Sequence, residues 1–316
     1  MNDNMDLTQG SIAGRLFTFF LPIAAGTIFQ QLYNAVDGIV VGRFVGTQAL
    51  AAVGGSPAVI VNLIVGFFTA LSAGFAVIVS QLFGAKEEKD MSKAVGTAIS
   101  FSLIIGLIVS VICIAFAPVF LKWMGTPEET IADATLYLRI YFIGTIFITV
   151  LNMESSILRA VGDSKHPFIY MIISCAMNII LDVTFVVYCG WGVAGVAIAT
   201  VIAQVLNMLL LSYQMTVKNS PCKFEFGDMK IDGGFLRKML RIGVPSGLQS
   251  SMYGISNLLL QVGVNSLGTV VVASWALSGK TDGLFWAITG AAGAAITTFA
   301  GQNYGAGRID RIKQSV

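Results

Sequence analysis

Long apolar segments, separated by short polar or charged breaks, occupy almost the whole chain. Charged residues, glycine and proline delimit eight of them, at 16–41, 49–82, 94–118, 131–158, 168–189, 193–215, 238–266 and 270–303. A helix needs about 20 residues to cross the hydrocarbon core of a bilayer, and every segment reaches that length. Apolar and polar residues do not alternate as they do in strands, and in lipid only a helix satisfies the backbone of a single segment. The pattern therefore predicts an all-α polytopic membrane protein.

The composition supports this class and excludes several others. Hydrophobic residues make up 55% of the 316 positions and charged residues only 11%, whereas an ordinary soluble domain has about 25% charged residues. A soluble enzyme, a nucleic-acid-binding protein and a disordered chain are thereby excluded. The sequence has no GxxxxGK[ST], GxSxG or HExxH motif and a single histidine. We therefore expect neither an enzyme nor a cofactor.

Basic residues are distributed unevenly between the two sides of the predicted helices. Fifteen of the nineteen lysine and arginine residues fall on the side that the eight-helix topology gives to the N-terminus. Cytoplasmic loops collect lysine and arginine. We therefore expect a cytoplasmic N-terminus and a multi-pass protein of the inner (plasma) membrane.

The chain repeats itself weakly at a period of 221 to 223 residues. Pro22 matches Pro245 at the start of a segment. Two further pairs of motifs follow in the same order: FVGT (44–47) with SLGT (266–269), and SQLFGAK (80–86) with GQNYGAG (301–307). Six predicted helices separate the copies, so the repeat preserves orientation, as in transporters with parallel lobes.

This repeat predicts the domain organisation. A six-helix N-terminal lobe is expected at 1–215, a cytoplasmic linker at 216–236, and helices seven and eight of an incomplete C-terminal lobe at 237–316. A second lobe of six helices would need four more, so we expect the chain to be truncated at its C-terminus.

Polar residues recur at helical spacing inside the apolar segments. On the first helix one face carries Gln30, Tyr33, Asn34 and Asp37, and on the fifth one face carries Ser174, Asn178 and Asp182. Matching stripes include Asn152 on the fourth helix and Thr200 and Gln204 on the sixth. Polar groups that faced lipid would be unsatisfied, so these stripes are expected to face one another or a watery cavity.

The two acids in these stripes call for a functional explanation. Hydroxyl and amide groups taken alone can simply join helices, but an ionisable group at membrane depth costs about 2.5–3.5 kcal/mol to insert. Asp37, Asn178, Asp182 and Thr200 together offer carboxylate, amide and hydroxyl oxygens, which bind hard cations such as Na⁺, while a carboxyl group can instead bind a proton. We predict a cation- or proton-binding site there, with Na⁺ and H⁺ both open.

Other polar residues are assigned more simply. Lys280 and Asp282 lie inside the eighth segment and are expected at the lobe interface, where they either bind ligand or pair with further helices. Glu154 is expected to be a solvated acid at the membrane surface, and His166 a solvated loop residue. The candidates for lining a substrate cavity are Gln30, Tyr33, Asn34, Gln204, Lys280 and Asp282.

Four stretches resemble the multidrug and toxic compound extrusion (MATE) family. They are FQQLYNAVDGIVVGRFVGTQALAAVG, NMESSILRAVGDSKHP, NIILDVTFVVYCGWGVAGVAIATVIAQ and GQNYGAGRIDR. The resemblance covers essentially the whole chain and is closest to the prokaryotic branch with an acid in the first helix. It implies a MATE-like architecture of two six-helix lobes with alternating access, of which the first lobe and two helices of the second are present.

The resemblance also implies an activity. It implies a secondary active transporter that exports organic cations in exchange for Na⁺ or H⁺, with the ion held at Asp37, Asn178, Asp182 and Thr200 and with Asn152 alongside. A small-molecule substrate and the bilayer are the expected partners, and the complete protein is expected to be a monomer. The alternatives are a flippase for lipids or lipid-linked oligosaccharides of the same superfamily, and a non-transporting membrane scaffold.

Overall fold

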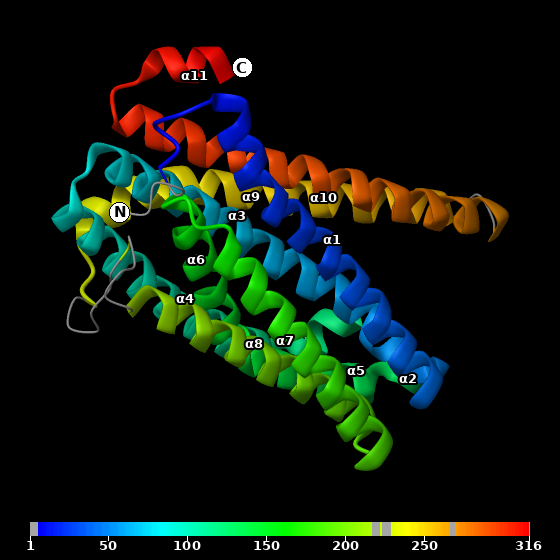
Figure 1. The fold of residues 1–316 in the computed structure, drawn as a ribbon. Helices are drawn as coiled ribbons and strands as arrows, with labels where there is room; N and C mark the ends of the chain where they lie inside the picture. Colours follow the sequence, from blue (N-terminus) through cyan, green and yellow to red (C-terminus); the bar gives the residue numbers. More distant parts are fainter. Residues whose placement is uncertain (1–5, 217–221, 223–228, 266–268, 316) are drawn as a thin grey trace.

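A computed structural model describes residues 6–216, 222, 229–265 and 269–315 (Figure 1). At some positions inside the helices, among them 33, 34, 37 and 280, it describes the backbone only. Within these residues the chain forms α-helices, one π-helical turn and no strand. The prediction of an all-α fold is confirmed.

The helices follow the predicted segments closely. They are α1 (Ile12–Phe44), α2 (Thr47–Gly54), α3 (Ser56–Ala85), α4 (Glu88–Trp123), α5 (Glu128–Ile143), α6 (Thr145–Ala160), α7 (Lys165–Asp182), the π-helical turn η1 (Val183–Tyr188), α8 (Gly192–Thr216), α9 (Gly233–Asn265), α10 (Thr269–Gly305) and α11 (Ile309–Ser315). Each predicted end lies within two helical turns of an observed one. Charged and glycine-rich breaks therefore locate the helix ends well.

Two predicted segments are broken rather than continuous. The second is divided at Gly55 into α2 and α3, where Pro57 begins a new helix because its fixed φ suits a first turn. The fourth is bent by 50° at Gly144, between α5 and α6. The first break coincides with Gly54, Gly55 and Pro57, a local turn signal inside the predicted segment, whereas the bend at Gly144 lies in apolar sequence with a single glycine.

Several of the helices can cross a membrane. Among the described residues, five spans are long and apolar enough, and the bent pair α5 and α6 makes a sixth if it counts as one. Helices α9 and α10, which include positions described by backbone only, are not among them. The chain is thus a multi-pass membrane protein, as predicted.

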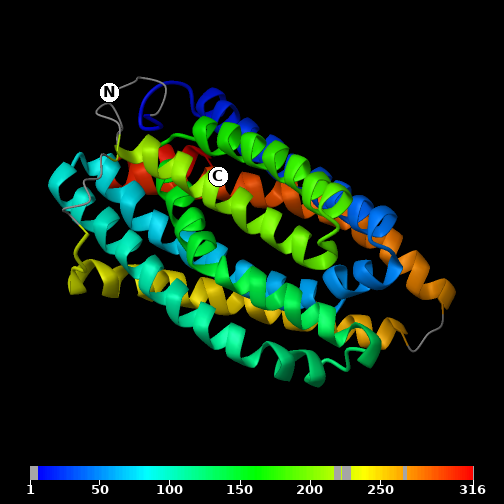
Figure 2. The same ribbon diagram turned by 90° about the horizontal axis from the view of Figure 1, so that it is seen from below.

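The helices run between two ends that differ in charge. Arg15, Lys86, Lys165 and Arg308 lie where α1, α4, α7 and α11 begin, and we call this the basic end (left in Figure 1). At the opposite, far end, α9 and α10 point away from α1 and α8 (Figure 1). Helices α1 and α7 pack side by side along one face (Figure 2).

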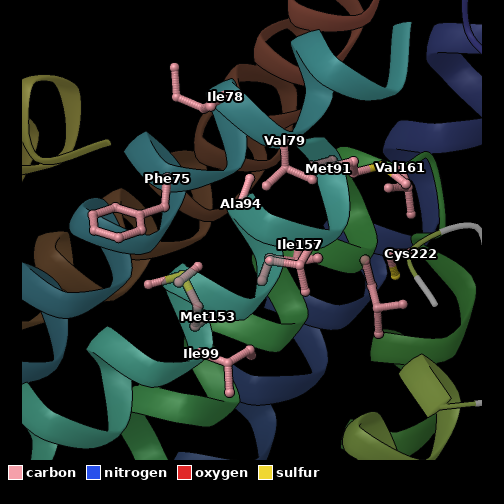
Figure 3. Close-up of a cluster of buried hydrophobic side chains, with 14 of the residues drawn as sticks. Phe75, Ile78, Val79, Met91, Ala94, Ile99, Met153, Ile157, Val161 and Cys222 are labelled. Carbon is pink, nitrogen blue, oxygen red and sulfur yellow. The ribbon is translucent and has the colours of Figure 1, made fainter. Parts of the chain in front are cut away.

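An apolar core near the basic end joins α3, α4 and α6. Phe75 and Val79 of α3, Ala94 of α4, and Met153 and Ile157 of α6 are all fully buried there and belong to one cluster (Figure 3). Because lipid is as apolar as these side chains, they stabilise the bundle by close packing rather than by leaving water. This core fixes α6 against α3 and α4, and α6 carries several of the predicted polar residues.

Candidate functional site

Two polar side chains on one face of α7 are fully buried. Asn178 and Asp182 are each 1% exposed, and their four-residue spacing puts them one turn apart on the same face. One turn nearer the basic end, Ser174 Oγ donates a 2.6 Å hydrogen bond to the carbonyl oxygen of Ala203 in α8. The polar face of α7 is therefore attached to α8.

Thr200 of α8 lies at the same level as Asn178. Helices α7 and α8 are antiparallel and are joined at Ser174 and Ala203. One turn toward the far end leads to Asn178 on α7 and to Thr200 on α8. Thr200 Oγ1 donates to the carbonyl oxygen of Val196 at 2.9 Å.

The side chain of Asp37 lies outside the described residues, but its backbone is described and can be placed relative to α7. At Gly26 of α1, an added Cβ would lie 3.6 Å from Cε of Met171 on α7. The two helices run in the same direction, side by side (Figure 2). Phe168 of α7 is nearer still, with its Cδ2 3.4 Å from that Cβ. Eleven residues further along, the backbone of Asp37 therefore comes level with the turn of α7 between Ile179 and Asp182.

Asn152, the fifth predicted ion-site residue, makes hydrogen bonds within α6 and to α3. Its Nδ2 donates to the carbonyl oxygen of Ile148 at 3.0 Å, and its Oδ1 accepts from Thr69 Oγ1 at 3.3 Å. The structure thus puts Asn178, Asp182 and Thr200 within one turn of the same level along the packed helices α7 and α8, and ties Asn152 to α3.

The helix changes its form directly after Asp182. There α7 gives way to the π-helical turn η1, in which the Cys189 N–H donates to the carbonyl oxygen of Thr184 at 3.0 Å. Such turns are rare and occur frequently at functional sites. Sequence reasoning missed this feature, because a π turn differs from an α turn only in its hydrogen-bond spacing and not in its residue types.

Glu154 is buried, and the prediction of a solvated acid is wrong. The side chain is 3% exposed, and its Oε1 accepts a hydrogen bond from Ser212 Oγ of α8. Its Oε2 is buried and has no partner among the described residues. Helix α8 continues to Thr216 and covers this acid, an effect that its position near the end of an apolar segment does not reveal.

His166 also departs from its prediction. It lies in the first turn of α7 and is half-buried, with Nδ1 2.6 Å from Oδ2 of Asp163. The backbone N–H of His166 donates to the other carboxylate oxygen at 3.1 Å. His166 is therefore part of an ordered helix start and not of a solvated loop.

A cavity of about 730 Å³ lies between α1, α3, α6, α9 and α10. We call it the central cavity, and its volume is in the range of small-molecule binding sites. Small and hydroxyl-bearing residues form most of the wall, with Asn62 and Thr69 on α3 and Trp286 on α10. Arg159 is the charged residue among the described lining residues.

The residues predicted to line a substrate cavity lie elsewhere, as far as they are described. Gln30 is exposed on α1, Gln204 lies beside Tyr141 inside the bundle, and Asp282 is exposed on α10. Asp282 Oδ2 accepts a 3.1 Å hydrogen bond from Nε1 of Trp286 and so contacts the cavity wall indirectly. The side chains of Tyr33, Asn34 and Lys280 lie outside the described residues.

Comparison with known proteins identifies the family. The family model described as MatE matches residues 22–184 and 245–316. The chain belongs to the MATE family. The two matched ranges begin 223 residues apart, which is the separation of Pro22 and Pro245 in the sequence repeat.

Named relatives of this MATE chain are drug-resistance proteins. The probable multidrug resistance protein YoeA of Bacillus subtilis (strain 168) is 30% identical over 98% of the chain, which spans 68% of YoeA. The multidrug export protein MepA of Staphylococcus haemolyticus (strain JCSC1435) is 24% identical over 85% of the chain and 60% of MepA. The MATE chain is thus a transporter rather than an enzyme, as expected.

Solved structures show the same fold. One, described as the outward-facing conformation of a multidrug resistance MATE family transporter, has a TM-score of 0.92 at 25% identity and covers 100% of this chain and 70% of its own. A second, from Pyrococcus furiosus, has the same score, identity and coverage. Its description reports a binding pocket of reverse polarity that suggests a different function.

Proposed function

We propose that this MATE chain is an antiporter that exports small organic molecules across the cell membrane in exchange for Na⁺ or H⁺. The observation that supports it is the pair Asn178 and Asp182, each 1% exposed inside a bundle of membrane-spanning helices. An ionisable group at membrane depth is costly and commonly marks an ion or proton pathway. Asp37 and Thr200, level with this pair, complete the proposed oxygen donor set.

Antiport requires that ion and cargo oppose each other. In the proposed mechanism the ion loads Asp37 and Asp182 from outside, the helices rearrange, and the affinity for cargo falls. The coupling is reciprocal, so bound cargo weakens ion binding by the same factor. A membrane potential of about 100 mV adds about 2.3 kcal/mol per charge moved, which corresponds to roughly fiftyfold accumulation.

The proposed orientation puts the basic end in the cytoplasm. Arg15, Lys86, Lys165 and Arg308 lie at that end, and cytoplasmic loops are the ones that collect basic residues. The helices up to 215 and those from 237 onward are proposed to move as two lobes around the central cavity, joined by 216–236, in a protein that acts as a monomer.

Organic cations are the cargo that the cavity wall supports best. Trp286 lines the cavity, and its ring lies 5.5 Å from that of Tyr253. Aromatic faces attract organic cations, most strongly where water is excluded. The drug-resistance names of YoeA and MepA agree with such a cargo.

A second candidate cargo is an anionic lipid or lipid-linked sugar. Arg159 is the charged residue among the described lining residues of the cavity, and a base suits a phosphate. The same proteoliposomes distinguish the two: ethidium movement supports a cation exporter, and movement of a fluorescent phospholipid without ethidium movement supports a flippase.

The ion site can be tested with Asp182→Asn and Asp37→Asn in the protein as its gene encodes it. Ethidium efflux from proteoliposomes is measured under an imposed Na⁺ gradient and, separately, a pH gradient. We expect at least about tenfold slower coupled efflux, because the neutral amide no longer attracts the ion. Glu128→Gln, an exposed acid on α5, is the matched control. Unchanged efflux in the double variant contradicts the site.

A further inference from the structure

A second cavity, of about 490 Å³, lies at the basic end between the starts of α1 and α7. We call it the basic pocket. Ser11, Arg15 and Thr18 line it from the α1 side, and Ser164 and Lys165 from the α7 side. It shares no lining residue with the central cavity and none with the proposed ion site.

Two cations face this pocket without an anionic partner. Among the described residues, neither Arg15 nor Lys165 forms an ion pair or a side-chain hydrogen bond. The acid in the wall, Asp163, is 2% exposed and is already engaged by the backbone N–H and the ring Nδ1 of His166. One carboxylate against Arg15 and Lys165 leaves the pocket lining with an excess of positive charge.

Both cations also lie at the unfavourable end of a helix. Arg15 is in the first turn of α1, and Lys165 is the first residue of α7. The N-terminus of a helix carries partial positive charge, which repels a base and attracts an anion. A bound anion would relieve both repulsions at once, since the two helix starts share one cavity.

The pocket also contains a buried hydroxyl group that is available as a donor. Ser164 is 5% exposed and lines the pocket, and its hydroxyl has no hydrogen-bond partner within the described ranges. Ser11 precedes α1 in the same way and does not cap it with its side chain. Hydroxyls beside two helix starts, an arginine and a lysine are the donor set that phosphate groups bind.

The position of the pocket indicates the source of the phosphate. The stretches Ile12–Leu32 and Lys165–Tyr188 are both candidate membrane spans, and the pocket lies at the first residues of both. Lipid phosphates lie at that depth. Large apolar side chains follow at the surface of each span, among them Leu21 and Ile169.

We propose that Arg15, Lys165 and Ser164 bind the phosphate group of a phospholipid from the leaflet at the basic end. The bound lipid joins the start of α1 to the start of α7, the two helices that carry Asp37 and Asp182. Free inorganic phosphate has the same chemistry, and the experiment separates the two sources.

The test measures the melting temperature of the delipidated protein in detergent during titration. The probes are dioleoylphosphatidylglycerol, inorganic phosphate and dioleoylglycerol, which has no phosphate. We expect only the phospholipid to raise the melting temperature of the wild type. In Arg15→Gln/Lys165→Gln its half-saturating concentration should rise at least about tenfold, because two charge-assisted contacts are lost. Lys89→Gln/Lys313→Gln removes two exposed charges from the same end and is the control.

Each outcome decides the question. If inorganic phosphate protects as well as the lipid and both effects vanish in the double variant, the phosphate site stands with a soluble ligand. If the double variant responds like its control, or if dioleoylglycerol protects equally, the proposal is overturned. Ser164→Ala keeps both charges and should weaken lipid binding several-fold. This variant provides a test even if the double variant does not fold. Lipid binding unchanged by Ser164→Ala would overturn the role of Ser164.

Discussion

Glycines on the same helix, α10, have opposite surroundings at the basic end and beside the central cavity. At the basic end, a Cβ on Gly305 would lie 1.9 Å from the backbone oxygen of Gln81 on α3, and one on Gly84 of α3 1.9 Å from that of Gln302. Beside the cavity, Gly290 and Gly293 have nothing within 4 Å of such a Cβ. The same residue type therefore lets two backbones meet in one region and leaves empty space in the other.

This difference explains how the interface between α3 and α10 can be closed at the basic end and open beside the central cavity. Small residues allow close helix approach in membranes, where packing rather than burial from water holds helices together. In the proposed orientation the shut end is the cytoplasmic one. One of the similar solved structures is described as outward-facing.

The shut end is also held by polar contacts. Gln302 of α10 is fully buried, and its Nε2 donates to the carbonyl oxygen of Ala160 at the end of α6 at 2.9 Å. Its Oε1 accepts from the backbone N–H of Leu7 at 3.0 Å. Arg311 donates to the carbonyl oxygen of Gly10 at 2.9 Å. We call these contacts between α3, α6 and α10 at the basic end the seal. The segment before α1 is thus bound to the seal.

The change with the largest expected effect is Gly84→Ala. The new methyl group would meet the backbone of α10, which cannot rotate away as a side chain can, so α3 and α10 must separate. We expect a destabilisation at or above the upper end of the about 1–3 kcal/mol that overpacking costs. Spin labels at positions 89 and 313, on either side of the seal, should report a longer distance.

Gly293→Ala is the matched control for this comparison. It adds the same methyl group to α10, where nothing lies within 4 Å. Its distance distribution should equal that of the wild type. If Gly84→Ala and Gly293→Ala changed the stability and the spin-label distance equally, the different surroundings of the two glycines would make no difference to the free energy of folding.

A smaller effect is expected for Gln302→Ala, which removes polar contacts from the seal and leaves the close backbone approach. The carbonyl of Ala160 and the N–H of Leu7 would lose buried partners, at a cost of about 1–3 kcal/mol. Hydrogen exchange at residues 6–10 should accelerate and the melting temperature should fall. Gln314→Ala, an exposed amide at the same end, should change neither. Unaltered exchange in Gln302→Ala would show that Leu7 is held by apolar packing instead.

Apolar patterning predicted this fold well, because helix ends in a membrane follow from charges and glycines that are local in sequence. The break at Gly55 and the bend at Gly144 were not predicted: Gly54, Gly55 and Pro57 are a turn signal that the long apolar segment around them outweighed, and Gly144 is a single glycine in apolar sequence. The pairs of helices that pack together could likewise not be predicted from the apolar pattern. The shut and open stretches of α10 depend on what faces each glycine, and that is a property of the partner helix.

The candidate site was predictable to the extent that it lies on single helices. The spacing of Asn178 and Asp182 placed both on one face of α7, and both are buried. Glu154 was misassigned, because its burial depends on the packing of α8 over α6 at Ser212 and not on its own surroundings in the sequence. A substrate cavity was predicted but the lining of the central cavity was not, since its wall combines one face from each of five helices.

The smallest expected effect concerns the open region and tests whether its wall is ordered. Asp282→Ala removes the acceptor for Nε1 of Trp286, an exposed hydrogen bond that contributes at most about 1 kcal/mol. The melting temperature should barely change, while the apparent affinity for ethidium, followed by Trp quenching, should fall about two- to fivefold because the indole loses its fixed orientation. Glu128→Ala, an exposed acid outside the cavity, is the control.

If Asp282 acts through Trp286, then Asp282→Ala should have no further effect in a Trp286→Phe background, where binding is followed by ethidium fluorescence. An additive loss would instead mean that Asp282 contacts the cargo directly.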